Sequence, residues 1–422
     1  MSTSRTRIAS LRPHRLPLLS WNQALAKRLL IKTLGHMEQG CLRLHEGDEC
    51  HEFGERADQA DLVADIHVHD PQAYSDVAFG GSVGSGEAYM SGYWSSPNLS
   101  AVTRIFVRNL RALDKMDTSQ SLLGKALLKG FHWLNRNTRE GSRRNISAHY
   151  DLGNDFFKLF LDPTMMYSSA IYPSADADLN TAAEYKLQRI CEKLELNADD
   201  HLLEIGTGWG GMAIYAARHY GCRVTTTTIS REQRDYALAA VKAEGLEDRI
   251  TVLFDDYRDL QGRYDKLVSV EMIEAVGHDH FGIYFDTCSR LLNDSGKMLI
   301  QAITIADQRY DQSRKSVDFI QRYIFPGGSL PSVSRIADLV RKKTDLVMVH
   351  FEDIGEHYAR TLADWRERFH AQVSTVREQG FDDRFIRMWE FYLCYCEGGF
   401  RERSIGTGQL VFAKPGYRHP SL

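Results

Sequence analysis

Short apolar segments alternate with helical segments from about residue 201 onward. This alternation is typical of a parallel β-sheet whose two faces are both covered by helices. The pattern predicts strands at residues 201–205, 222–228, 250–254, 266–270 and 297–303. Two further strands, at 346–352 and 409–413, are expected to close the sheet. The predicted fold class is therefore α/β.

Two longer segments with helical periodicity, 312–344 and 358–400, interrupt the last third of the chain. Both are rich in aromatic residues. Their apolar faces have two interpretations: they line an apolar groove, or they pack onto the core of their own domain, which is the commoner use of such faces.

The first 115 residues follow a different pattern. It predicts a helix at 21–37, a strand at 64–68 and, from its Gly-Gly and Ser-Gly pairs, turns in the glycine-rich run 80–92. An amphipathic helix is predicted at 122–133, followed by the polar, basic run 135–145. We therefore expect a smaller N-terminal domain over residues 1–120, a linker over 121–145 and a second domain over 146–422.

Composition supports a folded two-domain protein. The chain has 422 residues, more than the roughly 250 to 300 at which single cores stop growing, with 43% hydrophobic and 26% charged residues and a net charge of -4. It contains no run of about 18 apolar residues that could span a bilayer. Its 7 cysteines are scattered without a C-x-x-C pair, which predicts neither a disulfide framework nor a metal site. A reducing, cytoplasmic location fits best.

The beginning of the chain is basic, because residues 1–37 contain Arg and Lys but no carboxylate. Such a segment is either a solvated terminus or a surface that anionic lipid headgroups attract. The second interpretation predicts peripheral association with the inner face of the membrane. Nucleic acid is not expected as a partner, because the chain is net acidic.

The strongest local motif is LLEIGTGWGG at residues 202–211, an apolar strand that ends in a glycine-rich turn before a helix. This arrangement suits an adenosine-containing cofactor. A dinucleotide site normally carries an acid about 20 residues further on, whereas this second strand ends in Thr225–Thr228. Glu204, two residues before the first glycine, suits the cationic sulfonium of S-adenosylmethionine. We therefore favour S-adenosylmethionine over NAD, and a methyltransferase over an oxidoreductase.

A series of segments then identifies a resemblance. They are ISAHYDLGNDFFKLFLDPT (146–164), TISREQ (228–233), DDYRDL (255–260), VSVEMIEAVG (268–277), YIFPGGSLP (323–331), YLCYCEGGFRERS (392–404) and, in the first domain, GSVGSGEAYMSGYW (81–94). Taken in their order along the chain, these segments resemble the cyclopropane-fatty-acyl-phospholipid synthases and the related mycolic acid cyclopropane synthases. The resemblance implies a Rossmann-like class I methyltransferase domain, a smaller lipid-engaging N-terminal domain, helical insertions over the acyl site, and a homodimer.

The resemblance also implies cofactor-binding residues: Tyr167, Ser168, Gly206, Gly208, Thr228, Gln233 and Tyr257. Backbone at the two glycines can approach the methionine part of the cofactor. Thr228 and Gln233 can bind the ribose hydroxyls, and Tyr257 can border adenine.

In the family, the double bond of an unsaturated phospholipid acyl chain attacks the methyl group of the cofactor, and loss of a proton from the new methyl closes a cyclopropane ring. The proton acceptor is a bound bicarbonate. The matching positions here are Glu274, Tyr358 and Ile303, with Ser169 in place of a customary cysteine and Gln301 in place of a customary histidine. Cys396 matches a cysteine traditionally assigned to the active site, and we expect it to line the site without acting as a nucleophile.

Gln301 cannot become cationic or relay a proton as histidine can. Three outcomes therefore remain in view: cyclopropanation, which we favour; C-methylation of the acyl chain to a methyl-branched or methylene product; and a degenerate lipid-binding protein.

Overall fold

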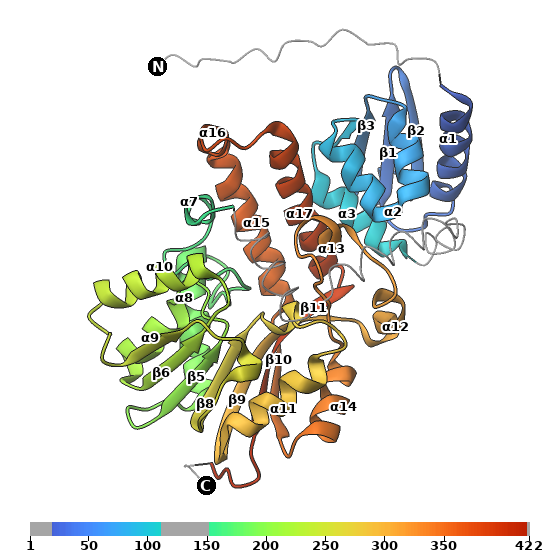
Figure 1. Ribbon diagram of the computed structural model, residues 1–422. Coiled ribbons are helices and arrows are strands. Elements are labelled where there is room, and N and C mark those ends of the chain that lie inside the picture. Colours follow the sequence, from blue (N-terminus) through green and yellow to red (C-terminus); the bar gives the residue numbers. More distant parts are fainter. Residues whose placement is uncertain (1–18, 111–151, 420–422) are drawn as a thin grey trace. The chain divides into compact units, whose positions relative to one another are not determined.

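The computed structural model describes residues 19–110 and 152–419, which divide into two compact units (Figure 1). The N-terminal unit contains residues 19–110 together with Asp383–Phe391. The second unit, which we call the catalytic unit after the role that the resemblance implies, contains the remaining described residues. The predicted helix at 122–133 and the basic run at 135–145 lie outside the described residues.

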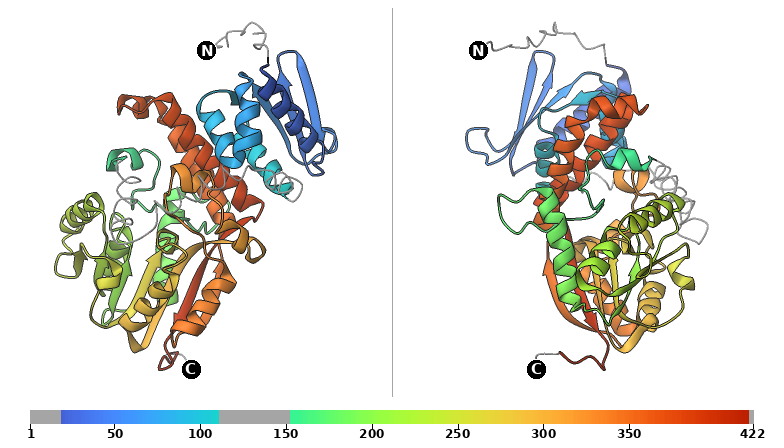
Figure 2. Two further views of the ribbon diagram at one scale, coloured as in Figure 1. Left: turned by 45° about the vertical axis from the view of Figure 1, so that its right-hand side comes forward. Right: turned by 90° about the vertical axis from the view of Figure 1, so that its left-hand side faces the viewer.

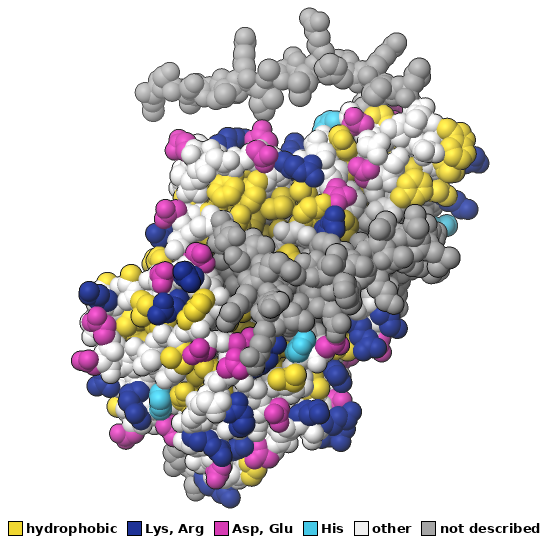
Figure 3. Space-filling view, viewed as in Figure 1, with side chains coloured by type: hydrophobic (Ala, Val, Ile, Leu, Met, Phe, Trp, Pro, Cys, Tyr) yellow, Lys and Arg dark blue, Asp and Glu magenta, His cyan; other side chains and the backbone are white. Residues whose placement is uncertain are grey.

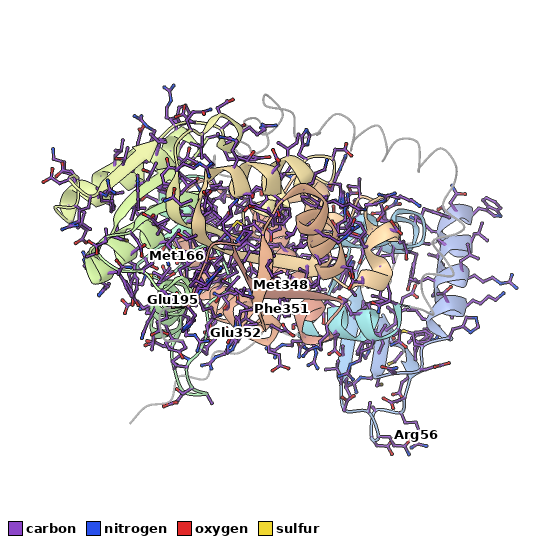
Figure 4. The ribbon with its side chains drawn as sticks, turned by 90° about the horizontal axis from the view of Figure 1, so that it is seen from below. Arg56, Met166, Glu195, Met348, Phe351 and Glu352 are labelled. Carbon is purple, nitrogen blue, oxygen red and sulfur yellow. The ribbon has the colours of Figure 1, made fainter. Side chains whose placement is uncertain are left out.

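The N-terminal unit is built on a four-stranded sheet in the order β2-β1-β3-β4. Strand β1 pairs with β2 antiparallel and with β3 parallel. The elements are α1 (Trp21–Leu34), β1 (Cys41–Glu46), β2 (Glu49–Gly54), β3 (Val63–Val68), α2 (Gln72–Met90), β4 (Trp94–Ser95) and α3 (Leu99–Arg108). The predicted helix at 21–37 and strand at 64–68 are confirmed as α1 and β3. The hairpin of β1 and β2, followed by the loop in which Figure 4 labels Arg56, was not predicted.

The prediction of turns at 80–92 is wrong for most of this run, because it belongs to α2. The helix is interrupted only at Gly81, whose φ of 56° and ψ of -135° are accessible to glycine but not to other residues. A Cβ on Gly84 would lie 2.0 Å from the carbonyl oxygen of Asp76. The glycines therefore allow two helical segments to pack closely, and tertiary packing overrides their low helix propensity.

The first half of helix α17 (Asp383–Arg401) completes the N-terminal unit. The Phe391 ring lies 5.7 Å from that of Tyr89 and 6.4 Å from that of Trp94. The Tyr89 hydroxyl donates a 2.7 Å hydrogen bond to Glu390. The second half of the same helix, from Tyr392 onward, belongs to the catalytic unit.

The catalytic unit is a Rossmann-like α/β domain with a seven-stranded sheet in the order β10-β11-β9-β8-β5-β6-β7. The run from β9 to β7 is parallel, and β11 pairs antiparallel with both β9 and β10. The strands are β5 (His201–Ile205), β6 (Arg223–Thr227), β7 (Ile250–Leu253), β8 (Tyr264–Val270), β9 (Leu292–Ile305), β10 (Val347–Asp353) and β11 (Ile405–Ala413). All seven predicted strands are confirmed.

Helices cover both faces of this sheet (Figure 2). The helices of this unit are α7 (Asn154–Phe157), α8 (Leu179–Leu194), α9 (Gly211–Tyr220), α10 (Arg231–Ala243), α11 (Phe281–Leu291), α12 (Tyr310–Ser313), α13 (Phe319–Tyr323), α14 (Val333–Lys343), α15 (Gly355–Ala371), α16 (Val373–Glu378) and the second half of α17, with short 3-10 helices η1 (Tyr257–Asp259), η2 (Ile273–Ala275) and η3 (Asp307–Arg309). Helices α8 and α9 contribute to the core on one face of the sheet, and α11 and α14 to the core on the other. Alternate residues of β5 enter two separate cores: Leu202 packs with α8 and α9, and Leu203 packs with α11 and α14.

The two predicted helical insertions have different outcomes. Residues 358–400 form α15, α16 and α17 as expected. Residues 312–344 are not one long helical stretch but short helices separated by loops. Pro326 and Pro331 lie between α13 and α14, and proline removes a backbone donor and disrupts a helix.

In the part of the chain that the structure describes, no helix has the length and apolar character needed to cross a membrane. The described residues also contain no group of three or more His, Cys, Asp or Glu side chains arranged to hold a metal ion. Lys and Arg are interspersed with Asp and Glu over the face of the catalytic unit in Figure 3.

Candidate active site

The predicted site residues gather where the parallel strands of the catalytic unit end, the usual ligand position in open α/β sheets. After β5, the backbone N–H groups of Gly206 and Thr207 both donate to the Thr227 carbonyl, at 3.1 and 3.0 Å. Gly206 and Gly208 have φ values of 103° and 52°. A Cβ on Gly208 would meet nothing within 4 Å, so the loop borders open space in which a ligand can approach the backbone.

The next two strand ends supply polar groups to the same region. The hydroxyl of Thr228 donates a 2.9 Å hydrogen bond to the Gln233 side chain, and both residues are buried. The hydroxyl of Tyr257 is buried without a hydrogen-bond partner among the described residues, while its ring packs 5.6 Å from that of Tyr284. An unsatisfied buried hydroxyl that follows a strand of the same sheet is available to an adenosine-containing cofactor.

Glu204 lies within the sheet beneath this loop. Its carboxylate accepts a 2.6 Å hydrogen bond from Thr226, and only 3% of the residue is exposed. Burial raises the pKa of Glu204 to about 8, although the Thr226 hydrogen bond opposes this shift. Its predicted interaction with the sulfonium stays a prediction.

Tyr167 and Ser168 belong to a segment that packs tightly against the start of α9. A Cβ on Gly211 would lie 2.4 Å from the Thr164 carbonyl oxygen and 3.2 Å from the sulfur of Met166, which is labelled in Figure 4. The absence of a side chain at 211 therefore permits this approach.

Aromatic residues from both insertions surround the Tyr167 ring. Trp365 of α15 lies 5.2 Å from it and Phe325 lies 6.3 Å from it, while the Tyr392 hydroxyl lies 2.9 Å from its own. Trp365 and Tyr392 are buried, so at this point the insertions pack onto the core of their own domain, and the apolar groove stays a prediction.

A buried lysine that the sequence did not reveal lies below this segment. Lys186 of α8 is 0% exposed, and its ammonium donates a 2.7 Å hydrogen bond to the hydroxyl of Ser168. Burial lowers the pKa of Lys186 to about 8, and the nearby carboxylates of Glu271 and Asp162 oppose this shift.

Glu271, which was also missed, occupies the centre of the predicted catalytic residues. It follows β8 directly and has a φ of 49°, a strained value for a residue other than glycine. One carboxylate oxygen accepts from the Ser169 backbone N–H at 2.9 Å and from the Gln301 amide at 2.8 Å. The other accepts from the Tyr358 hydroxyl at 2.8 Å.

Glu274 lies close to Glu271 in the following 3-10 helix. One of its carboxylate oxygens accepts from the backbone N–H of Ile303, and the other is buried without a partner among the described residues. Burial, and then the charge of Glu271, raise the pKa of Glu274 to about 8. Burial also raises the pKa of Glu271, against four groups that stabilise its ionised form: Gln301, Ser169, Lys186 and Tyr358. The shared negative charge therefore rests on Glu271.

Gln301 is oriented by a chain of hydrogen bonds that crosses three strands. Lys193 donates to Glu352 of β10, labelled in Figure 4, and to the amide oxygen of Gln409. Gln409 then donates its own N–H to the Gln301 oxygen at 2.9 Å. Because its oxygen is occupied, Gln301 presents its NH₂ group to Glu271.

Tyr358, Ser169 and Cys396 are placed as follows. The Tyr358 ring stacks on Phe400 at 4.4 Å. The Ser169 hydroxyl donates to the Ala170 carbonyl, so its backbone N–H and not its hydroxyl reaches the anion. Cys396 influences the pKa of both Tyr358 and Tyr392, and burial raises the pKa of its own thiol far above the usual range. The protonated thiol agrees with a lining position.

The groups that the resemblance implies for bicarbonate are therefore brought together, but around a side chain. The Ser169 N–H, the Gln301 amide and the Tyr358 hydroxyl already donate to Glu271. These residues do not fit a separately bound anion.

Comparison with known proteins agrees with this architecture. The family model described as mycolic acid cyclopropane synthetase matches residues 137–410. The chain is 37% identical over 420 residues to the tuberculostearic acid methyltransferase of Mycobacterium tuberculosis, covering 95% of this chain and 93% of that protein. It is 38% identical over 352 residues to the cyclopropane-fatty-acyl-phospholipid synthase of Escherichia coli K12, covering 83% and 88%.

Two solved structures resemble the catalytic unit. A cyclopropane synthase from Mycobacterium tuberculosis has a TM-score of 0.60 at 28% identity, and a mycolic acid cyclopropane synthase complexed with SAH and CTAB has a TM-score of 0.61 at 28% identity. Each covers 64% of this chain and 98% of the solved chain. The chain belongs to the cyclopropane synthase family of S-adenosylmethionine-dependent methyltransferases.

Proposed function

We propose that this enzyme transfers a methylene group from S-adenosylmethionine to the double bond of an unsaturated fatty acyl chain in a phospholipid and closes a cyclopropane ring. One observation carries the proposal: the glycine loop and the carboxylate pair are adjacent. A Cβ on Gly206 would lie 3.2 Å from the Met272 side chain, and Met272 connects Glu271 to the η2 helix that contains Glu274.

The residues of the chain supply what this reaction needs. When bound, the cofactor supplies an electrophilic methyl group. An alkene is a weak nucleophile, so it must be held against that methyl, and water must be kept from the resulting carbocation. The partly exposed rings of Tyr167 and Phe325, with the buried Trp365 packed beside Tyr167, supply an apolar surface that excludes water, and aromatic π faces favour a nearby cation.

The experiment is incubation of the purified protein with S-adenosylmethionine and vesicles of unsaturated phospholipid, followed by chromatography, mass spectrometry and proton NMR of the acyl chains. We expect a product one CH₂ heavier that contains ring methylene protons and no alkene. A Glu274→Ala variant should form this product at least tenfold more slowly, because the Ile303 N–H loses its acceptor and the carboxyl group beside Glu271 is removed.

A Glu378→Ala variant, which removes an exposed carboxylate from α16, is the matched control and should keep the wild-type rate. Cofactor binding without any heavier product, from several unsaturated phospholipids, would contradict the proposal.

A second candidate is C-methylation of the acyl chain to a methylene or methyl-branched product. Two observations favour it: Gln301 stands in place of the customary histidine, and the relative aligned over 95% of this chain is named a methyltransferase. The same NMR experiment separates the candidates, because an exocyclic methylene gives alkene proton signals and a ring does not.

We also propose that helix α1 binds the membrane surface that presents the substrate. Trp21, Leu25 and Leu29 recur every four residues and are 78%, 40% and 42% exposed. Arg28 and Lys32 are exposed on the same face, opposite the buried Ala26 and Leu30. An exposed apolar stripe with basic residues suits the interface of an anionic bilayer.

The Leu25→Glu, Leu29→Glu double variant should therefore bind vesicles containing phosphatidylglycerol at least tenfold more weakly in co-sedimentation. Wild-type binding should weaken as salt is added. The control is a Val347→Glu, Val349→Glu double variant on β10, whose side chains are 58% and 49% exposed. Equal losses in the two double variants would contradict a specific role of α1.

A further inference from the structure

The donors that converge on Glu271 point to a catalytic role for its carboxylate. We propose that Glu271 is the base that removes the proton from the newly added methyl group, a task for which this enzyme then needs no dissolved anion. The inference rests on the proposed function and adds to it a base that belongs to the chain itself.

The position of Glu271 is the first argument. Its backbone N–H donates to the Gln301 carbonyl at 2.7 Å, which links the end of β8 to β9. The next residue, Met272, packs on Gly206 of the cofactor loop, and the Ser169 N–H joins the Glu271 carboxylate to the segment that contains Tyr167 and Ser168. The carboxylate thus lies between the two segments expected to hold the methyl donor.

The surroundings also keep Glu271 ionised in preference to its neighbour Glu274. Glu271 faces two neutral donors on side chains, one backbone donor and the Lys186 ammonium, whereas the groups that stabilise ionised Glu274 are two backbone N–H groups, its own and that of Ile303. Asp162 is a further charged group near Lys186. Two adjacent carboxylates in different environments separate into one ionised and one protonated group.

The backbone of Glu271 is strained. Glu271 adopts a φ of 49° that costs about 1 kcal/mol or more in a residue with a Cβ. Such strain persists where the surrounding structure fixes it, and it is frequent at functional positions. Here four hydrogen bonds fix the residue: one with Ser169, one with Tyr358, and two with Gln301, of which one uses the Gln301 side chain and one its backbone. The packing of the next residue, Met272, on Gly206 adds a fifth contact.

An alkene carbon bonds to the methyl while the bond between that methyl and the sulfur of S-adenosylmethionine breaks. The electron pair of the broken bond stays on sulfur, S-adenosylhomocysteine is the leaving group, and a cation is left on the adjacent carbon of the acyl chain. Glu271 takes one proton from the new methyl, and the electron pair of that C–H bond forms the second C–C bond of the ring. Glu271 becomes a neutral carboxylic acid and loses its proton to solvent before the next turnover, which its partial exposure permits.

The test compares Glu271→Gln and Glu271→Gly with the wild type in buffer freed of carbon dioxide and in the same buffer with added bicarbonate. Gln removes the base and keeps the shape. Gly removes the side chain and opens space for an anion among the same donors, and glycine tolerates the φ of 49° without strain. Turnover of unsaturated phospholipid, cofactor affinity by calorimetry and thermal unfolding are measured for each.

We expect wild-type turnover to change by less than twofold when bicarbonate is removed or added. Glu271→Gln should lose at least about 100-fold in either buffer with its cofactor affinity retained, which is typical of a lost general base. Glu271→Gly should recover at least tenfold with bicarbonate. Glu184→Gln, at an exposed position of α8, is the matched control and should behave as the wild type.

A wild type that loses tenfold or more without bicarbonate overturns the inference, and so does a Glu271→Gln variant within threefold of the wild type. These results differ from failure of the proposed function, in which the wild type forms no product in either buffer. If the Glu271→Gln variant unfolds, the responses of the wild type and of Glu271→Gly to bicarbonate still show whether Glu271 is the base.

Discussion

Gly208→Leu should weaken S-adenosylmethionine binding at least 100-fold in calorimetry, while the protein keeps its fold. The wild-type loop leaves open space where a Cβ at 208 would project, and we expect the cofactor to approach the backbone of the loop through that space. A leucine side chain would fill it. A 100-fold loss corresponds to about 2.7 kcal/mol of binding free energy.

The control for this variant is Gly245→Leu, because Gly245 also has a positive φ, of 64°, and open space around its Cβ. It lies between α10 and β7, away from the glycine loop. Both variants carry a similar backbone strain of about 1 to 2 kcal/mol. If they lower cofactor affinity equally, strain and not occupation of the site explains the loss.

Lys186→Met should make the enzyme more stable and less active at pH 7. Burial lowers the pKa of Lys186 to about 8 in the folded protein, below its usual 10.5 when unfolded. Keeping the lysine charged at pH 7 therefore costs about 3 kcal/mol, and this cost disappears as the pH rises from about 8 to 10.5. Methionine avoids it but leaves the Ser168 hydroxyl without its donor, so we expect a net gain of about 2 kcal/mol.

The activity of Lys186→Met should fall at least tenfold at pH 7, because the ammonium is one of the groups that favour ionised Glu271. Without it the pKa of Glu271 rises further, and the acid limb of the profile of kcat/KM against pH should move to higher pH. Lys242→Met, at an exposed position of α10, should change neither property. A Lys186→Met variant that loses stability at pH 7 would show that the buried ammonium does not lower the free energy of unfolding.

The catalytic sheet was predictable because its pattern is simple. Strands buried on both faces, such as Leu202–Ile205 and Leu267–Val270, are mostly apolar, here interrupted only by Glu204 and Ser269, and the glycine loop follows the first of them directly. Strand β5 has the predicted bounds, and the other strands differ at their ends, where pairing with neighbours decides the length. Strands β9 and β11 are much longer than predicted, because β9 begins at Leu292, which pairs with Tyr264, and β11 begins at Ile405, which pairs with Ile305.

The parts that sequence did not predict depend on contacts between distant segments. The glycines of α2 read as turns, but the close approach of Gly84 to Asp76 uses them inside a helix. Gln409 and Lys186 carry no signal in the sequence, because their roles depend on the fold: β11 places Gln409 beside Gln301, and α8 places Lys186 beside Ser168. Glu271 did carry a signal: a carboxylate immediately after a buried parallel strand, at the edge where ligands bind.

The division of α17 between the two units has a consequence for biosynthesis. The N-terminal unit needs Phe391 against Tyr89 and Trp94, and these partners are about 300 residues apart in the chain. During synthesis the aromatic surface around Tyr89 and Trp94 therefore stays without the Phe391 ring until almost the whole polypeptide has been made. This surface is therefore the part of the chain on which a chaperone has the longest time to act. A ribosome that stops before residue 383 releases a chain in which both units lack residues that belong to them.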